Sequence, residues 1–218
     1  MRGHDARIGC GDVMQLLVFA KAPVRGEVKT RIAAKIGAVA ATRLHEALVG
    51  RTLAVAVAAD IGDVVLCCAP DTSHPFFGRM QRELGVSLAP QVGDDLGERM
   101  AAAFARHCPA VLVGCDCPVL SSAHLQAAAR ALASGADAVL MPAEDGGYVL
   151  VGLNAPQSGL FAGMTWGHER VMAETRARAA ALGLSCVELE TLWDLDRPAD
   201  LHRLRGLAPA WLGRERDL

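Results

Sequence analysis

The feature that most constrains this 218-residue chain is its alternation of short apolar segments with alanine-rich helical stretches. The apolar segments are continuous, which is typical of strands that are buried on both faces of a parallel sheet. Strands are predicted at 14–21, 63–70, 86–91, 110–116, 137–143, 147–153 and 185–190. Helices are predicted at 30–60, 75–84, 96–107, 121–134, 168–182 and 197–206.

This pattern indicates an α/β protein whose mainly parallel sheet is covered by helices on both faces. The segments 137–143 and 147–153 follow each other too closely for a helical crossover, so one strand should run antiparallel to its neighbours. The helical stretch 30–60 contains Gly37 and Gly50, where we expect breaks. Residues 1–12 are expected to be disordered, and residues 13–218 to form a single domain.

Composition limits the partners. A net charge of -2 gives no case for binding nucleic acid. No apolar run approaches the roughly 18 residues that a membrane span needs, and no secretion signal is evident. The seven cysteines lack the spacing of a disulfide framework or of a zinc site, so we expect reduced thiols in a cytoplasmic protein. The oligomeric state stays open, with a homodimer among the alternatives.

A basic cluster follows the first predicted strand, where ligands bind in sheets of this kind. The segment APVRGEVKTR places Arg25, Lys29 and Arg31 around Gly26, just before a helix N-terminus that would attract an anion. We expect these side chains to bind a phosphate or diphosphate, although a solvated basic turn is the alternative. The G-x-x-x-x-G-K-[ST] spacing is absent, which argues against a Walker-type NTPase.

Carboxylates follow two later segments. Asp116 ends the strand 110–116 and should face the ligand crevice, with Cys115 pointing away because side chains alternate along a strand. There it could hold a divalent cation that neutralises ligand phosphates. Asp194 and Asp196 should point to one side and could share the metal, but Asp196 is equally suited to cap the last helix.

Two glycine-bearing segments are further candidates. In GDDLGERM, Asp95 has the spacing of a helix cap, while Gly93 and Gly97 could admit a flat ring close to the backbone. In EDGGYVLVGL, two glycines follow Asp145; they leave room for a substrate, although a tight hairpin turn would also need them. Trp166 and His168, on a loop before a helix, are weaker candidates on the acceptor side.

Five segments together resemble one bacterial family. FAKAPVRGEVKTR, GDDLGERM, VGCDCPVL, DGGYVLVGL and LWDLDRPADL, in this order, are similar to the glycosyltransferase-A-like proteins of DUF2064 over residues 14–205. The resemblance implies a Rossmann-like three-layer α/β/α sandwich with a mixed, mostly parallel sheet. This is the GT-A type of fold of nucleotide-diphospho-sugar transferases, a superfamily that also contains guanylyltransferases.

The resemblance further implies a transferase that uses Mg²⁺ or Mn²⁺ and a nucleotide-activated donor, either a nucleotide-sugar or an NTP. The implied catalytic residues are Asp116 and Asp145, and the implied metal ligands are Asp116, Asp194 and Asp196. The expected nucleotide-binding residues are Ala22, Pro23, Arg25, Gly26, Lys29, Arg31, Gly93, Leu96 and Gly97. The expected acceptor-binding residues are Gly146, Gly147, Tyr148, Trp166 and His168.

The expected activity is glycosyl transfer from a nucleotide-diphospho-sugar to a small-molecule acceptor. The alternatives are a nucleotidyltransferase, which joins an NTP to a phosphorylated small molecule, and a nucleotide-binding module without catalysis. The chain lacks the L-A-A-G-x-G-x-R segment of nucleotidyltransferases, and its DCP sequence retains only the first carboxylate of the D-x-D motif of glycosyltransferases.

Overall fold

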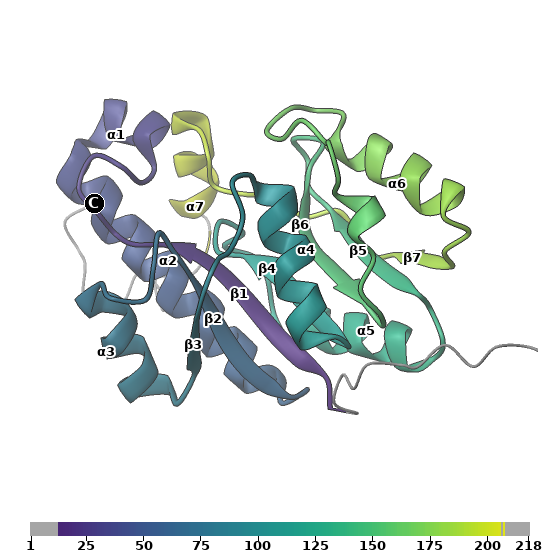
Figure 1. Cartoon of the computed structure of the whole chain (residues 1–218). Helices are drawn as coiled ribbons and strands as arrows, with labels where there is room; N and C mark the ends of the chain where they lie inside the picture. Colours follow the sequence, from purple (N-terminus) through teal and green to yellow (C-terminus); the bar gives the residue numbers. More distant parts are fainter. Residues whose placement is uncertain (1–12, 206, 208–218) are drawn as a thin grey trace, which may run out of the picture.

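The computed structural model describes residues 13–205 and 207, whose strands form a seven-stranded sheet in the order β3-β2-β1-β4-β6-β5-β7 (Figure 1). The strands are β1 (Gln15–Lys21), β2 (Asp63–Ala69), β3 (Ser87–Pro90), β4 (Ala110–Gly114), β5 (Ala138–Pro142), β6 (Tyr148–Leu153) and β7 (Cys186–Glu188). The helices are α1 (Thr30–Ile36), α2 (Ala38–Ala59), α3 (Pro75–Leu84), α4 (Leu96–His107), α5 (Ser122–Ala133), α6 (Val171–Ala181) and α7 (Leu201–Arg205). Two short 3-10 turns are η1 (Ser158–Leu160) and η2 (Pro198–Asp200).

The predicted sheet topology is confirmed. Strand β6 pairs antiparallel with β4 and with β5, while the other strand pairs are parallel. The fold is therefore the predicted mixed, mostly parallel α/β/α sandwich of the GT-A type. Residues 1–12, which we predict to be disordered, and 208–218, which we predict to belong to the same domain, lie outside the described residues.

The interior strand β1 shows why the sheet needs helices on both faces (Figure 1). Successive side chains of a strand point to opposite faces, and all five residues Leu16–Ala20 are buried. Leu16, Val18 and Ala20 pack with α2, α3 and α5 on one face, whereas Leu17 and Phe19 pack with α4 and α6 on the other. A third apolar cluster joins α1, α2 and α7 around Trp193 and Leu195.

Local signals account for most element boundaries. The Ser121 hydroxyl accepts from the backbone N–H of His124, and the two residues form the capping box of α5. The stretch 30–60 breaks at Gly37, whose φ is 83°, but not at Gly50, which lies inside α2. Helix α6 begins three residues later than predicted, and the last predicted helix is divided into η2 and α7.

The structure bears on the expectations for the cysteines and for membrane-spanning segments. Cys67, Cys68, Cys115 and Cys117 are buried free thiols, as predicted for cysteines inside apolar segments. Among the described helices, none combines the length and the apolar character that a membrane span requires.

Two glycine substitutions should have opposite effects on stability. A Cβ at Gly152 in β6 would lie 2.6 Å from Cγ1 of Val139, so Gly152→Ala should destabilise the protein by about 1–3 kcal/mol through overpacking. A Cβ at Gly50 would meet only Met80 Sδ at 4.0 Å, so Gly50→Ala should stabilise α2 by about 0.5–1 kcal/mol. Urea unfolding of both variants measures this; a Gly152→Ala variant as stable as the parent chain would contradict the packing argument.

Candidate active site

A cleft of about 570 Å³ opens beyond the carboxyl ends of β1 and β4. Its walls come from the end of β1, the loop into α1, and the residues that follow β4, with side chains from α2 and α4 completing it. This is the position where parallel α/β sheets bind their ligands. We refer to it as the first cleft.

Lys29 lies in the first cleft and joins three segments that are distant in the sequence. Its Nζ lies 2.8 Å from Asp116 Oδ1 and donates to the backbone oxygen of Leu195 at 2.5 Å. The Lys29 side chain is only 4% exposed, whereas that of Asp116 is 47% exposed. The ammonium is thus held by its partners, while the carboxylate still faces the cleft.

The backbone at Lys29 is in the left-handed region, with φ 49° and ψ 39°. A residue with a Cβ pays about 1–3 kcal/mol for such a conformation, and the surrounding contacts must hold it there. The ion pair with Asp116 and the hydrogen bond to Leu195 are such contacts.

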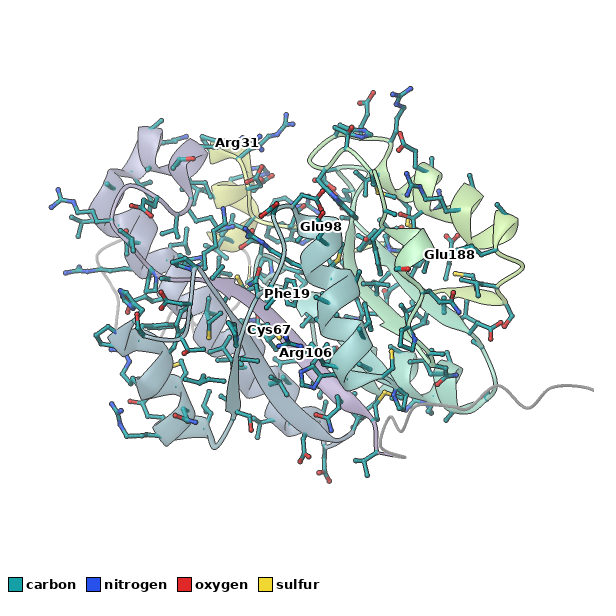
Figure 2. All side chains as sticks on the ribbon, viewed as in Figure 1. Phe19, Arg31, Cys67, Glu98, Arg106 and Glu188 are labelled. Carbon is teal, nitrogen blue, oxygen red and sulfur yellow. The ribbon has the colours of Figure 1, made fainter. Side chains whose placement is uncertain are left out.

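Arg31, on α1, lines the first cleft, and its side chain lies between α1 and α7 (Figure 2). Its guanidinium donates to the carboxylate of Asp196 in an exposed ion pair. The structure therefore brings Lys29 and Arg31 of the predicted phosphate-binding loop to this site, together with Leu96. The structure also describes the other predicted residues of this loop, and they do not line the first cleft. They are Ala22, Pro23, Arg25 and Gly26.

A second cleft, of about 1120 Å³, lies on the other side of the Arg31–Asp196 pair, since both residues line both clefts. Asp145, Gly146 and His168, predicted on the acceptor side, line this second cleft. Asp194 lines it as well. Part of each predicted set thus lies in one of two adjoining clefts that share a charged boundary, while Gly147, Tyr148 and Trp166 of the acceptor side do not line the second cleft.

The turn at Asp145 is built by its own hydrogen bonds. The N–H of Gly147 donates to Asp145 Oδ1 at 2.8 Å, as in the hairpin-turn alternative. A Cβ at Gly146 would lie 2.0 Å from the backbone oxygen of Glu169, so this glycine allows the loop before α6 to pack closely. Asp145 itself remains exposed.

Tyr148 and Trp166, predicted to bind the acceptor, pack against each other with ring centroids 6.4 Å apart. Burial raises the pKa of Tyr148, and its hydroxyl lies 3.8 Å from Met100 Sδ. A Cβ at Gly97 would lie 3.0 Å from the indole of Trp166. The flat ring for which Gly97 leaves room is therefore a side chain of the protein.

Gly93 also has a role within the protein. Its φ of 134° favours glycine, and an added Cβ would lie 2.6 Å from Cβ of Glu98. Asp95 caps α4 as predicted, because its Oδ1 accepts from the N–H of Glu98 at 2.9 Å. Gly93 thus serves the start of α4.

The carboxylates of the site crowd one another. Burial and the negative charges of Asp145, Asp116 and Asp196 raise the pKa of Asp194 to about 6. The three predicted metal ligands nevertheless do not form one compact group. In the part of the chain that the structure describes, a different group of three possible ligands is compact. It consists of His45, Cys115 and Asp116, whose ligand atoms all lie within 4.8 Å of one another.

One local prediction near these residues is wrong, and the helix-cap alternative for Asp196 is not found. Cys115 does not point away from Asp116, since its Sγ lies 3.6 Å from Asp116 Oδ1; β4 ends at Gly114, so strand alternation no longer applies. Asp196 does not cap the last helix. The carboxylate of Asp200 accepts the N–H groups of Asp196 and Arg197, and thereby fills that role.

Several residues that line the clefts were missed. His45 is buried on α2, and its Nε2 lies 2.9 Å from the backbone oxygen of Lys21, while burial lowers its pKa. Its only sequence signal is a histidine within an alanine-rich helix. Arg203, in the second cleft, makes two hydrogen bonds to Glu144 and lies over the Trp193 ring at 4.3 Å.

The fold and the paired clefts define a GT-A-type protein with basic and acidic side chains at its strand ends. Three solved structures are similar. A Desulfovibrio desulfuricans G20 protein, provisionally assigned as a nucleotide-diphospho-sugar transferase, is 28% identical, with 93% of this chain and 94% of that chain covered and a TM-score of 0.80. A nucleotidyl transferase from Methanothermobacter thermautotrophicus is 14% identical, with 93% and 99% covered and a TM-score of 0.61.

The third, a Mycobacterium tuberculosis H37Rv protein in complex with manganese, is 17% identical, with 90% and 100% covered and a TM-score of 0.52. At these identities the second and third structures establish the fold alone. The model of the family described as uncharacterized proteins conserved in bacteria, DUF2064, matches residues 52–168. The chain belongs to this family. No curated protein matches it.

The raised pKa of Asp194 predicts a pH-dependent effect on stability. The folded state keeps the Asp194 proton up to a pH of about 6, whereas the unfolded chain loses it near the ordinary value of 3.8. Stability therefore falls as the pH rises between these values, and the full penalty is present above pH 6. In metal-free protein, Asp194→Asn should raise the melting temperature at pH 8 and change it little at pH 4.

The matched control is Asp137→Asn, because hydrogen bonds from Ser185 lower the pKa of the exposed Asp137. That group stabilises the fold above its unfolded pKa, so this variant should lose stability at pH 8. Thermal scans in a chelating buffer at both pH values measure the two effects. An equal shift for Asp194→Asn at pH 4 and pH 8 would contradict the prediction.

Proposed function

We propose that the chain is a metal-dependent transferase that moves a glycosyl group from a nucleotide-diphospho-sugar to a small-molecule acceptor. The observation that carries the proposal is the Lys29–Asp116 pair in a cleft beyond β1 and β4. A side-by-side ammonium and carboxylate offer one contact to a diphosphate and another to the cation that neutralises it. The similarity to the Desulfovibrio protein supports the same class of donor.

The first cleft suits a nucleotide in size and charge. Its volume of about 570 Å³ lies within the range of small-molecule sites, roughly 300–1,000 Å³. Lys29 would contact phosphate oxygens directly. Arg31 is exposed, and its pairing with Asp196 is a surface ion pair of at most about 1 kcal/mol, so Arg31 can exchange that partner for a phosphate at little cost.

The carboxylates fit a hard cation. Mg²⁺ and Mn²⁺ prefer oxygen ligands, and Asp116 and Asp194 provide them with Asp196 close by. The negative charge that raises the pKa of Asp194 is a second indication, because a cation would relieve it. When bound, the ion would neutralise the charge of the diphosphate.

The side chains themselves explain how transfer would be accelerated. The acceptor oxygen forms a bond to the anomeric carbon while the bond from that carbon to the leaving phosphate oxygen breaks. Lys29 and Arg31 stabilise the charge that grows on that phosphate. Asp145, in the second cleft, orients the acceptor hydroxyl and accepts its proton.

Nucleotidyl transfer is the second candidate, because a nucleotidyl transferase shares the fold over 93% of this chain. The same first cleft would then hold an NTP. The acceptor would attack the α-phosphorus, and pyrophosphate would leave.

Replacing Asp116 should remove metal-dependent nucleotide binding. Loss of a residue that only orients a metal ligand lowers metal affinity by about 10–100-fold. Asp116 is proposed to bind the metal directly, so we expect Asp116→Asn to weaken Mn²⁺-dependent nucleotide binding by at least this order. The measurement is titration calorimetry with UDP-sugars, GDP-sugars and NTPs, with and without Mn²⁺. Asp63→Asn, at the amino end of β2, is the control and should bind normally. Wild-type binding by Asp116→Asn would show that the site assignment is wrong.

The product distinguishes the two reactions. Incubation with a panel of nucleotide-sugars, NTPs and acceptors should release a nucleoside diphosphate together with a glycosylated acceptor. Pyrophosphate release from an NTP would instead establish nucleotidyl transfer. Metal-dependent binding without turnover across the panel would indicate a non-catalytic nucleotide-binding module.

A further inference from the structure

We propose that His45, Cys115 and Asp116 form a second cation site in the first cleft, which shares Asp116 with the site of the hard cation and suits a borderline-soft divalent ion such as Zn²⁺. One ligand atom from each residue lies within 4.8 Å of the other two. All three residues line the first cleft, where His45 and Cys115 are buried and Asp116 is the exposed ligand, so an ion would enter at the Asp116 carboxylate. The inference does not depend on the proposed transferase activity.

The hydrogen bond of His45 favours metal binding. Nε2 lies 2.9 Å from the backbone oxygen of Lys21, and a carbonyl oxygen only accepts, so Nε2 carries the hydrogen. The lone pair is therefore on Nδ1. A histidine that binds a metal nearly always donates its other ring N–H to a carbonyl or carboxylate, which fixes the ring and its tautomer. With Nδ1 bound to the ion, the Lys21 oxygen would be this outer partner of His45.

Cys115 determines which ion the site prefers. Its Sγ lies 3.6 Å from Asp116 Oδ1, so sulfur and oxygen ligands are adjacent. Thiolate and imidazole ligands favour Zn²⁺ over Mg²⁺, and three protein ligands leave a fourth position for water. On binding, the Cys115 thiol releases its proton to solvent and a metal–sulfur bond forms, with no change in oxidation state.

Lys29 opposes this ion. Its ammonium lies 2.8 Å from Asp116 Oδ1, where it competes for the carboxylate and repels a second positive charge. An ion bound to His45, Cys115 and Asp116 would in turn withdraw Asp116 from Lys29. A bound ion would therefore inhibit the binding of any ligand that needs the Lys29–Asp116 pair.

Cobalt is the probe, because Co²⁺ replaces Zn²⁺ and its bond to a thiolate gives a near-ultraviolet charge-transfer band. Titration of the full chain with Co²⁺, without nucleotide, should produce this band, and added Zn²⁺ should remove it. Cys115→Ser should lose the band, and His45→Gln should weaken Co²⁺ binding by about tenfold or more. Cys117→Ser is the matched control, since this buried thiol lies two residues away and outside the group.

Lys29→Met should change the affinity for the soft metal ion and the affinity for the nucleotide in opposite directions. It should tighten Co²⁺ and Zn²⁺ binding while weakening nucleotide binding, which separates this inference from the proposed function. Circular dichroism confirms that each variant is folded. A band that is absent from the parent chain, or that persists in folded Cys115→Ser, would overturn the inference. Loss of the band in folded Cys117→Ser would overturn it as well.

Discussion

The ion pair between Lys29 and Asp116 is the interaction on which the arrangement of the clefts depends. A buried ammonium without a partner is strongly unfavourable, so Lys29, at 4% exposure, needs both Asp116 and the Leu195 oxygen. Each partner belongs to a different part of the chain, and the backbone of Asp116 also accepts the N–H of Leu195 at 2.8 Å. The same contacts therefore hold the loop after β1 and the 192–197 segment against the residues that follow β4.

The charge distribution differs between the two clefts. In the first, Lys29 balances Asp116 at short range. In the second, Asp194 is half-buried and lies in the field of Asp145, Asp116 and Asp196, which is why its pKa is raised. Arg31 reaches the boundary between the clefts but pairs with Asp196 at the surface, where an ion pair is weak. The excess negative charge thus lies on the acceptor side of Lys29.

Sequence patterns predicted what is local or set by topology. Continuous apolar strands predicted the sheet class, and the short connection between 137–143 and 147–153 predicted one antiparallel strand, which is β6. Strand ends predicted ligand-facing positions for Lys29 and Asp116, and the contact between these two side chains adds to that prediction. The roles of Tyr148 and Trp166 were not predictable in this way. Trp166 covers Gly97, 69 positions earlier, and Tyr148 reaches Met100; no local pattern encodes such packing. His45 was missed because its partner, Lys21, lies on another element.

Asp116 lies where three kinds of positive charge can compete for it. The ammonium of Lys29 holds it at 2.8 Å, a hard cation would share it with the oxygen ligands of the second cleft, and a softer one would share it with His45 and Cys115. Asp116 remains 47% exposed, so its carboxylate is open to an incoming ion. Ligand hardness then decides the outcome, because the sulfur of Cys115 and the nitrogen of His45 favour a softer ion, whereas the carboxylates of Asp194 and Asp196 favour a hard one.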